Sequence, residues 1–298
     1  MTQPLGINRR MFTDSNRIEE QLANVRAVML DCLNDTHLAQ LLPANNNLPA
    51  CGKMLRSRLL LTVGQANGLD EQMLIHAAAA VEIIHTASLL HDDVIDGGTL
   101  RRGAPTFWKK HGINGAILFG DLLVVKGLNL LTEINRPDLL QELIQMSSQV
   151  CAAEVEQELL LRGSPGSWAE CEQIARAKTG SLFAFSAMAS SDGSVEQTAA
   201  LREAGYLLGT VYQLADDILD AFGNEAASGK TLGTDDQRGK TTAITAKKDA
   251  PPDPTAYIYA LLEASAQQLN TWPELQITWY AFIESAIKPI LKKHLIFA

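Results

Sequence analysis

The stretch EQMLIHAAAAVEIIHTASLLHDDVIDGG, residues 71–98, decides how this chain folds. We predict one helix from Asp70 to Asp92, because alanine strongly favours the helix and the run Ala77–Ala80 lets neighbouring helices approach closely. Gly97 and Gly98 end that helix, since glycine is costly inside a helix and favourable just beyond its end. The nearly continuous apolar character of the segment predicts a helix in the interior of a bundle.

The rest of the chain is predicted to be helical as well. Apolar residues recur at steps of three and four, which is the period of an amphipathic helix. The expected helices cover residues 18–32, 53–66, 113–131, 137–161, 168–189, 195–220, 255–269 and 273–295. No segment shows the two-residue alternation of a strand, and the stretch with Arg101 and Arg102 is expected to be a loop. The breaks are too short for a domain linker, so we predict one all-α domain over residues 1–298.

Composition narrows the class of protein. The chain has 298 residues, and 34 acidic against 25 basic residues give a formal net charge of −9, which argues against a nucleic-acid binder. The apolar segment Ile113–Leu131 is interrupted by Asp121 and Lys126, so we do not expect it to span a membrane. No apolar segment typical of a signal peptide follows Arg9 and Arg10.

The cysteines form no CxxC pair, which argues against a zinc site or a redox motif; they are Cys32, Cys51, Cys151 and Cys171. A chain of this length can bury a large core without disulfides, so reduced thiols in the cytosol are the plainer interpretation. We therefore expect a cytoplasmic protein.

Two acidic clusters stand at the ends of predicted helices. DDVID occupies residues 92–96, and the same spacing returns in DDILD at residues 216–220. Aspartates four residues apart share a helix face and repel, and the helix macrodipole disfavours anions at a C-terminal end. A cation relieves both penalties, and Mg²⁺ commonly bridges one or two carboxylates to substrate phosphates. One cluster alone is equally consistent with a solvated acidic face, but the pair favours a site for magnesium and diphosphate.

Basic residues flank both clusters: Lys53, Arg56, Arg101, Arg102, Lys178, Lys230 and Lys240. Arginine binds phosphate oxygens through two parallel hydrogen bonds, whereas lysine acts as a point charge. Each alone is more often a surface charge, although the apolar neighbours of Lys178 predict a buried setting. His85, two helical turns before Asp92, is either a core histidine or a ligand-binding one. The absence of a GxxxxGK[ST] loop and of a Ser/His/Asp arrangement argues against nucleotide phosphoryl transfer and nucleophilic catalysis.

With these residues the chain resembles the trans-isoprenyl diphosphate synthases, or polyprenyl synthetases. Six motifs stand in the family's order: GKMLRSR at 52–58, IHTASLLHDDVIDGGTLRRGAPT at 84–106, GD at 120–121, KTGSLF at 178–183, YQLADDILDAFG at 212–223 and GKTLGTDDQRGKTT at 229–242. The resemblance implies an orthogonal helical bundle of the isoprenoid synthase type around a central active-site cavity. It also implies a Mg²⁺-dependent trans-prenyltransferase that condenses isopentenyl diphosphate with an allylic diphosphate by ionisation, condensation and elimination.

The resemblance further implies a role for each matching residue. Isopentenyl diphosphate would bind Lys53, Arg56, His85 and Arg102. The allylic diphosphate would bind Arg101, Lys178, Lys230 and Lys240. About three Mg²⁺ ions would be held by Asp92, Asp96 and Asp216, with Asp93, Asp217 and Asp220 as nearby partners. Lys178, Thr179 and Gln213 would act in catalysis, the last two with dipoles that face the allylic cation.

The chain departs from the family pattern at several places. Cys51-Gly52-Lys53 replaces the usual Gly-Gly-Lys, Ser57 replaces a proline, and Gly97–Gly98 replaces acidic or polar residues. The C-terminal segment offers only Lys292 and Lys293 where many members have an arginine-rich tail. None of these positions is an expected metal ligand, so activity is still expected, whereas closure of the tail over the isopentenyl site is left open.

Product length is predicted from Ala87 and Ser88, the small residues about one helical turn before Asp92. Because no bulky side chain stands there to close the product tunnel, we expect an all-trans product of C20 or longer, unless Ile84 or Val125 blocks it deeper down. A short-chain (farnesyl) diphosphate synthase, a class I terpene cyclase and a non-catalytic regulatory subunit of a heteromeric synthase are the alternatives. The second DDxxD cluster and the basic residues argue against the last two. The resemblance implies a homodimer, with Ile113–Leu131 as an interface candidate, but identifies neither the primer nor the pathway.

Overall fold

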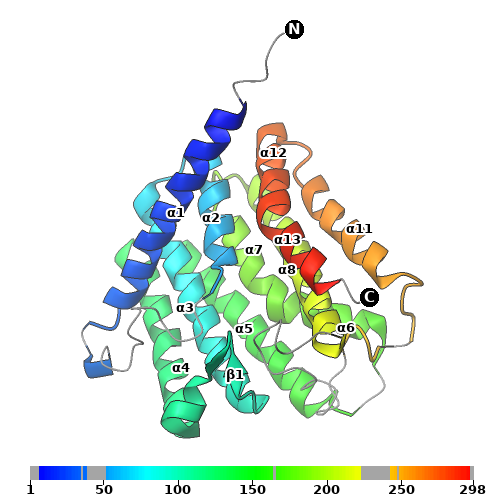
Figure 1. The fold of residues 1–298 in the computed structure, drawn as a ribbon. Helices are drawn as coiled ribbons and strands as arrows, with labels where there is room; N and C mark the ends of the chain where they lie inside the picture. Colours follow the sequence, from blue (N-terminus) through cyan, green and yellow to red (C-terminus); the bar gives the residue numbers. More distant parts are fainter. Residues whose placement is uncertain are drawn as a thin grey trace.

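The computed structural model describes residues 7–34, 36–38, 52–163, 166–222, 242–246 and 248–295. Its helices are α1 (Ile7–Asp31), α2 (Leu55–Ala66), α3 (Glu71–Ile95), α4 (Phe107–Glu133), α5 (Pro137–Leu159), α6 (Trp168–Ala175), α7 (Ser181–Met188), α8 (Val195–Phe222), α11 (Pro254–Gln267), α12 (Pro273–Phe282) and α13 (Lys288–His294). In Figure 1, α2, α3, α7 and α8 lie in the middle, between α1 and α4 on one side and α11, α12 and α13 on the other. The predicted all-α bundle is confirmed.

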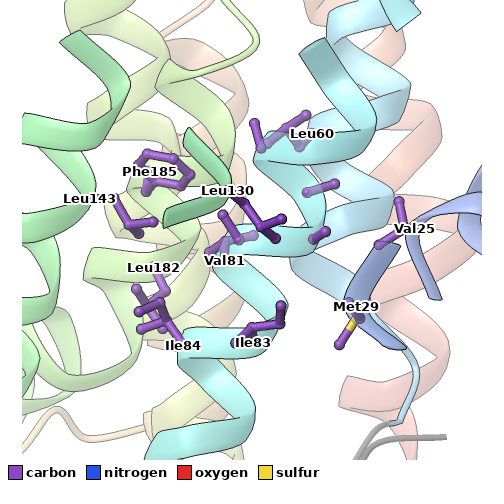
Figure 2. Close-up of a cluster of buried hydrophobic side chains, with 14 of the residues drawn as sticks. Val25, Met29, Leu60, Val81, Ile83, Ile84, Leu130, Leu143, Leu182 and Phe185 are labelled. Atoms are coloured by element: carbon purple, nitrogen blue, oxygen red, sulfur yellow. The ribbon is translucent and has the colours of Figure 1, made fainter. Parts of the chain in front are cut away.

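Two clusters of buried apolar side chains meet at α2 and α7. One cluster joins these helices to α1, α3, α4 and α5, and the other joins them to α6, α8, α11, α12 and α13. Every residue of α7 is buried, with Leu182 and Phe185 in the first cluster and Phe183 in the second. Figure 2 shows Ile84 of α3 and Leu143 of α5 on the side of Leu182 and Phe185. α7 therefore links the two halves of the core.

The central helix α3 begins and ends as its sequence predicts. The Asp70 side chain caps the first turn by accepting a hydrogen bond of 2.8 Å from the Met73 backbone N–H. At the other end the Asp96 N–H donates to the Asp92 carbonyl at 2.7 Å, so the helix extends three residues beyond the predicted end at Asp92. The first acidic cluster thus occupies the last helical turn, with Asp96 as the C-cap.

The loop prediction for the segment after α3 is wrong in detail. Leu100–Arg101 (β1) and Ala104–Pro105 (β2) pair as a small antiparallel hairpin. Its two-residue turn, Arg102-Gly103, has positive φ at both positions (54° and 73°), which suits the right-handed twist of a hairpin. Strands of two residues are too short to show alternation in a sequence. In this hairpin Arg101 contacts Asp93, and Arg102 packs against Gly52.

Two predicted helices are interrupted by π-helical turns. The expected helix 168–189 is divided into α6 and α7 by the turn Arg176–Gly180 (η2), and the expected helix 273–295 is divided into α12 and α13 by Ile283–Ile287 (η3). A π turn inserts an extra residue into the helical ladder without a signal in the apolar pattern, and such turns are frequent at functional sites. Lys178 and Thr179, two predicted catalytic residues, lie inside η2.

α3 and α4 are each long and apolar enough to cross a membrane by length and composition alone. In the most apolar 18 residues of each helix, 72% are buried in α3 but only 39% in α4. α3 is therefore a core helix, whereas α4 carries exposed apolar residues, among them Ile117, Leu118 and Val125. No disulfide joins the cysteines that the structure describes. The absence of a membrane span and the cytoplasmic location stay predictions.

Candidate active site

The two acidic clusters each divide their carboxylates between the surface and the interior. In α3, Asp92 and Asp96 are partly exposed, while Asp93 is only 4% exposed. In α8, Asp216 is partly exposed, while Asp217 is only 7% exposed. The three aspartates predicted to hold metal are thus accessible, and the middle aspartate of each cluster is turned into the protein.

Arg101 lies between the two clusters. Its guanidinium bonds Asp93 Oδ1 through Nε at 2.9 Å and Nη2 at 2.8 Å. Burial alone would lower the pKa of Arg101, but the hydrogen bond to Asp93 and the surrounding negative charges raise it. Those charges include Asp92 of the first cluster and Asp216 of the second. The charges of both acidic clusters therefore raise the pKa of the same arginine, which means that the two clusters lie near each other.

Arg102 packs against the backbone of Gly52. A Cβ atom added at Gly52 would lie 2.6 Å from Arg102 Nη1, and closer still to Nη2 and Cζ. A side chain at Gly52 would therefore displace the Arg102 guanidinium, whereas the backbone here does not call for glycine, because φ at this position is not positive. Burial, Lys293 and Arg102 lower the pKa of Lys53, which places these cations close together.

Arg56 is 8% exposed, and its charge is balanced inside the core. Its guanidinium lies over the Phe183 ring, 4.7 Å from the centroid, and it is electrostatically coupled to the buried carboxylate of Glu82. Burial raises the pKa of Glu82, opposed by Arg56 and by a 3.1 Å hydrogen bond from the Ser57 N–H. Burial and the charges of three arginines, Arg56, Arg102 and Arg101, lower the pKa of His85 well below 6.5.

The four predicted isopentenyl residues are therefore neighbours in space. The charge of Arg102 lowers the pKa of both Lys53 and His85, and the charge of Arg56 also lowers the pKa of His85. A dianion placed among them would relieve the repulsion between these cations. The structure brings the set together, while its assignment to isopentenyl diphosphate stays a prediction.

Lys178 of η2 lies near the first acidic cluster. Its Nζ lies 2.5 Å from Glu154 Oε1 on α5, and its side chain is 18% exposed, as the sequence predicts for a buried setting. Burial alone would lower the pKa of Lys178, but the charges of Asp92, Glu154 and Asp96 raise it above its ordinary value. Lys178 is thus held at the first acidic cluster, where the sequence placed the allylic diphosphate.

Two facing glycines bring Thr179 to Gln213. A Cβ atom at Gly209 of α8 would lie 2.6 Å from the Gly180 Cα, so a side chain at Gly209 would push η2 away from α8. At this close approach the Thr179 hydroxyl donates to Gln213 Oε1 at 2.5 Å. Gln213 Nε2 in turn donates to Asp217 Oδ1 at 2.8 Å. The predicted pair Thr179 and Gln213 is therefore one end of a longer hydrogen-bond chain.

The C-terminal helix reaches this site. Lys293 contributes to the lowered pKa of Lys53, and the His294 Nδ1 lies 3.9 Å from Asp216 Oδ1. The His294 ring also meets the Tyr212 ring edge-on at 6.0 Å between centroids. α13 therefore brings the positive charge of Lys293 close to Lys53. Whether the C-terminal segment closes over the isopentenyl site stays open.

The predicted chain-length residues differ in their surroundings. Ala87 is fully buried, and Ser88 is partly exposed, with its hydroxyl donating to the His85 carbonyl at 2.9 Å. Ile84 is buried in the core, whereas Val125 is 64% exposed on α4 and points away from the interior of this chain. Of the two deeper positions considered, only Ile84 lies in the interior of this chain.

The donor set suits magnesium that is shared with a ligand. Asp92, Asp96 and Asp216 offer hard carboxylate oxygens, the kind that Mg²⁺ prefers. Within the part of the chain that the structure describes, no three His, Cys, Asp or Glu side chains come close enough to enclose an ion. An ion here would be held by one or two carboxylates and would complete its shell with water and phosphate oxygens. Lys230 and Lys240 lie outside the described residues.

Sequence reasoning missed several partners in the site. Glu82 could have been found, because it is the only acidic residue between Glu71 and Asp92 in an apolar helix, and such a charge is rarely buried without a partner. Glu154 lies in an ordinary amphipathic pattern that gives no such signal. His294 comes to Asp216 only through tertiary packing.

Several known proteins are similar to this chain in sequence and in fold. The profile of the polyprenyl synthetase family matches residues 38–272. An octaprenyl diphosphate synthase of Haemophilus influenzae is 32% identical, over 64% of this chain and 59% of that protein, so less than two thirds of its length is spanned. A farnesyl diphosphate synthase of Geobacillus stearothermophilus is 36% identical over 66% of this chain and 71% of that protein. The polyprenyl synthase of Caulobacter crescentus, solved with calcium and isoprenyl diphosphate, superimposes with a TM-score of 0.71 and 29% identity, covering 94% of this chain and 93% of that one. The all-α bundle is thus the isoprenoid synthase fold.

Proposed function

Because the chain belongs to the polyprenyl synthetase family, we propose that it is a Mg²⁺-dependent trans-prenyltransferase. It condenses isopentenyl diphosphate with an allylic diphosphate to give an all-trans polyprenyl diphosphate. The similarity to one octaprenyl and one farnesyl synthase supports this reaction class. The calcium and isoprenyl diphosphate in the related Caulobacter structure support a divalent ion and a diphosphate ligand.

The observation that carries the proposal is the position of Arg101 between the two acidic clusters. Arg101 donates a hydrogen bond to Asp93, and the negative charges of Asp92 and Asp216 both raise its pKa. Carboxylates from two helices thus act on one arginine. The charge of Asp92 also acts on Lys178, and the charge of Arg102 acts on Lys53 and His85. The basic residues Lys53, Arg56 and Arg102 argue against a terpene cyclase, which has no isopentenyl site. The two intact acidic clusters argue against a regulatory subunit.

The chain's own residues divide the work of catalysis. Lys178 and Arg101 bind the allylic diphosphate and stabilise the charge that grows on it as its C–O bond breaks, which is electrostatic catalysis. Lys53, Arg56, His85 and Arg102 hold isopentenyl diphosphate so that its double bond faces the allylic cation. Thr179 and Gln213 present dipoles to that cation. When bound, Mg²⁺ neutralises the allylic diphosphate and makes it a better leaving group.

We propose a product of C20 or longer, as the small residues Ala87 and Ser88 predict. Ile84, Leu182 and Phe185 lie deeper in the core and form the limit to growth (Figure 2). A farnesyl synthase is the alternative, and it is favoured if Ile84 does not move aside.

Product analysis tests the reaction and its length together. The purified protein is incubated with labelled isopentenyl diphosphate, Mg²⁺ and in turn dimethylallyl, geranyl or farnesyl diphosphate, and the dephosphorylated products are separated by chromatography. We expect elongation to C20 or beyond, and none when the ion is chelated. Growth that stops at C15 would favour the farnesyl alternative, cyclic hydrocarbons would favour a cyclase, and no product with any primer would favour a regulatory subunit.

We further propose that the enzyme is a homodimer through α4 and α5. Exposed apolar side chains follow both neighbouring helices, including Leu118 and Val125 on α4 and Val155 and Leu159 on α5. A second copy of this face would remove all of them from water. Light scattering after gel filtration should report a dimer for the wild type and a monomer for Leu118→Lys. Ile277→Lys is the matched control, because Ile277 on α12 is equally exposed at 68%; a monomeric wild type would contradict the proposal.

A further inference from the structure

Asp217, the middle aspartate of the second cluster, is surrounded by hydrogen-bond donors from three parts of the chain. Its Oδ1 accepts from Gln213 Nε2 at 2.8 Å. Its Oδ2 accepts from the Ala243 backbone N–H at 3.1 Å and from the Cys171 thiol at 3.8 Å. Both carboxylate oxygens are therefore engaged with protein groups, and the side chain is only 7% exposed.

We propose that Asp217 is a positioning residue, which sets the direction of the hydrogen-bond chain that ends at the Thr179 hydroxyl. The inference rests on the proposed function, in which Thr179 faces the allylic cation. It separates the role of Asp217 from that of Asp216, the accessible neighbour that is predicted to hold metal.

The direction of the chain follows from the chemistry of its end. An ionised carboxylate can only accept hydrogen bonds, so the amide nitrogen of Gln213 must face Asp217. The amide oxygen of Gln213 then faces Thr179, 2.5 Å from its hydroxyl oxygen. The hydroxyl must donate its single hydrogen to that oxygen, and only its lone pairs are left for other neighbours. A cation beside Thr179 therefore meets electron density and never the hydroxyl hydrogen.

The reversed chain would have the opposite effect. With the Gln213 amide flipped, its nitrogen would donate to Thr179, and the hydroxyl hydrogen could point at the cation. A positive dipole end beside a carbocation raises the barrier that the site has to lower. Asp217 thus acts on the reaction through Gln213 and Thr179 without touching the substrate.

The first acidic cluster shows the same arrangement. Its middle aspartate, Asp93, is 4% exposed and orients Arg101 through two contacts under 3 Å. In both DDxxD clusters the buried second carboxylate holds a side chain of the site, while the first carboxylate is accessible. The parallel argues that the second aspartate of each cluster positions other residues.

The substitution Asp217→Asn tests the proposal. Asparagine keeps the shape but replaces one oxygen by an NH₂ group, and Gln213 and Ala243 donate to different oxygens of Asp217, so one of the two donors loses its acceptor. We expect kcat to fall about 10-fold or more, as for loss of one oriented dipole, while the Mg²⁺ concentration for half-maximal activity and the KM of both diphosphates change less than about 3-fold. Asp216→Asn is the matched comparison and should raise the Mg²⁺ requirement. An Asp217→Asn enzyme that needs more Mg²⁺, or that keeps the wild-type kcat, overturns the inference.

A double-mutant cycle checks that Asp217 acts through Thr179. Thr179→Val removes the hydroxyl, so adding Asp217→Asn should cost no more than about 2-fold further, because coupled residues are not additive. Losses that multiply would show that the two residues act separately. If Asp217→Asn fails to fold, Gln213→Leu breaks the same chain and should lower kcat at least as far as Thr179→Val does, because Gln213 also faces the allylic cation. A wild-type kcat would overturn the proposal.

A measurement without turnover separates this inference from the proposed function. The Ala243 N–H should exchange slowly with deuterium in the wild type and at least about 10-fold faster in Asp217→Ala, which removes both acceptor oxygens. A wild type that makes no prenyl product would refute the proposed function and leave this hydrogen-bond test standing. Equal exchange in both proteins would overturn the assignment of Asp217.

Discussion

Gly52→Ala is the substitution whose effect can be worked out most fully. The added Cβ would lie 2.6 Å from Arg102 Nη1, whereas ordinary contacts begin at about 3.4 Å. Nη2 and Cζ would lie closer still, so the guanidinium must move by more than 0.8 Å, the difference between these two distances. Arg102 is exposed and flexible, so we expect the free energy of unfolding to change by no more than about 0.5 kcal/mol.

The displaced guanidinium should weaken binding of isopentenyl diphosphate. A hydrogen bond to a charged group contributes about 1.5–3 kcal/mol, which corresponds to about 10- to 150-fold in affinity. Steady-state kinetics with each substrate varied in turn should show the KM for isopentenyl diphosphate rising within that range. The KM for the allylic substrate should stay within about 2-fold, because Lys178 and Arg101 are not displaced.

The same substitution in an Arg102→Ala background isolates the cause. Without the guanidinium the three atoms nearest the new methyl group are gone, so Gly52→Ala should add less than about 2-fold to the loss. An unchanged KM for isopentenyl diphosphate in the single variant would refute the contact between Gly52 and Arg102 as the reason for this glycine. Multiplying losses in the double variant would refute it equally.

Two further predictions concern product length and pH. Ala87→Phe should shorten the product detected by chromatography and, because Ala87 is fully buried, lower the free energy of unfolding by about 1–3 kcal/mol; unchanged products would show that Ala87 does not line the tunnel. The pKa of His85 lies well below 6.5 in the folded protein, so below pH 6.5 the unfolded chain binds a proton that the folded chain does not, and stability is lost as the pH falls. From pH 7 to 5 the melting temperature of His85→Gln should therefore fall less than that of the wild type, and equal slopes would contradict a neutral, half-buried histidine.

The sequence alone determined much of this protein, because its signals are local. The helical period, the alanine run of α3 and the glycines after Asp96 depend on neighbours within a few residues. They predict the bounds of α2, α3, α5, α8 and α11 to within a turn, whereas α1 and α4 begin earlier than predicted, at Ile7 and Phe107. The repeated DDxxD spacing at 92–96 and 216–220 likewise predicts paired carboxylates on helix ends. The small hairpin and the π turn at Lys178 were not predicted, because neither alters the apolar pattern of the sequence.

The tertiary structure alone decided how the residues of the site share their work. Asp92 and Asp93 are adjacent in an identical local pattern, yet one is accessible and the other bonds Arg101, because only the hairpin after α3 brings that arginine back. Asp217 accepts hydrogen bonds from outside its own helix only because Ala243 folds onto α8 and Cys171 of α6 packs beside it. Spacing along a helix determines which side chains share a face, whereas burial and partners depend on segments that are distant in the sequence.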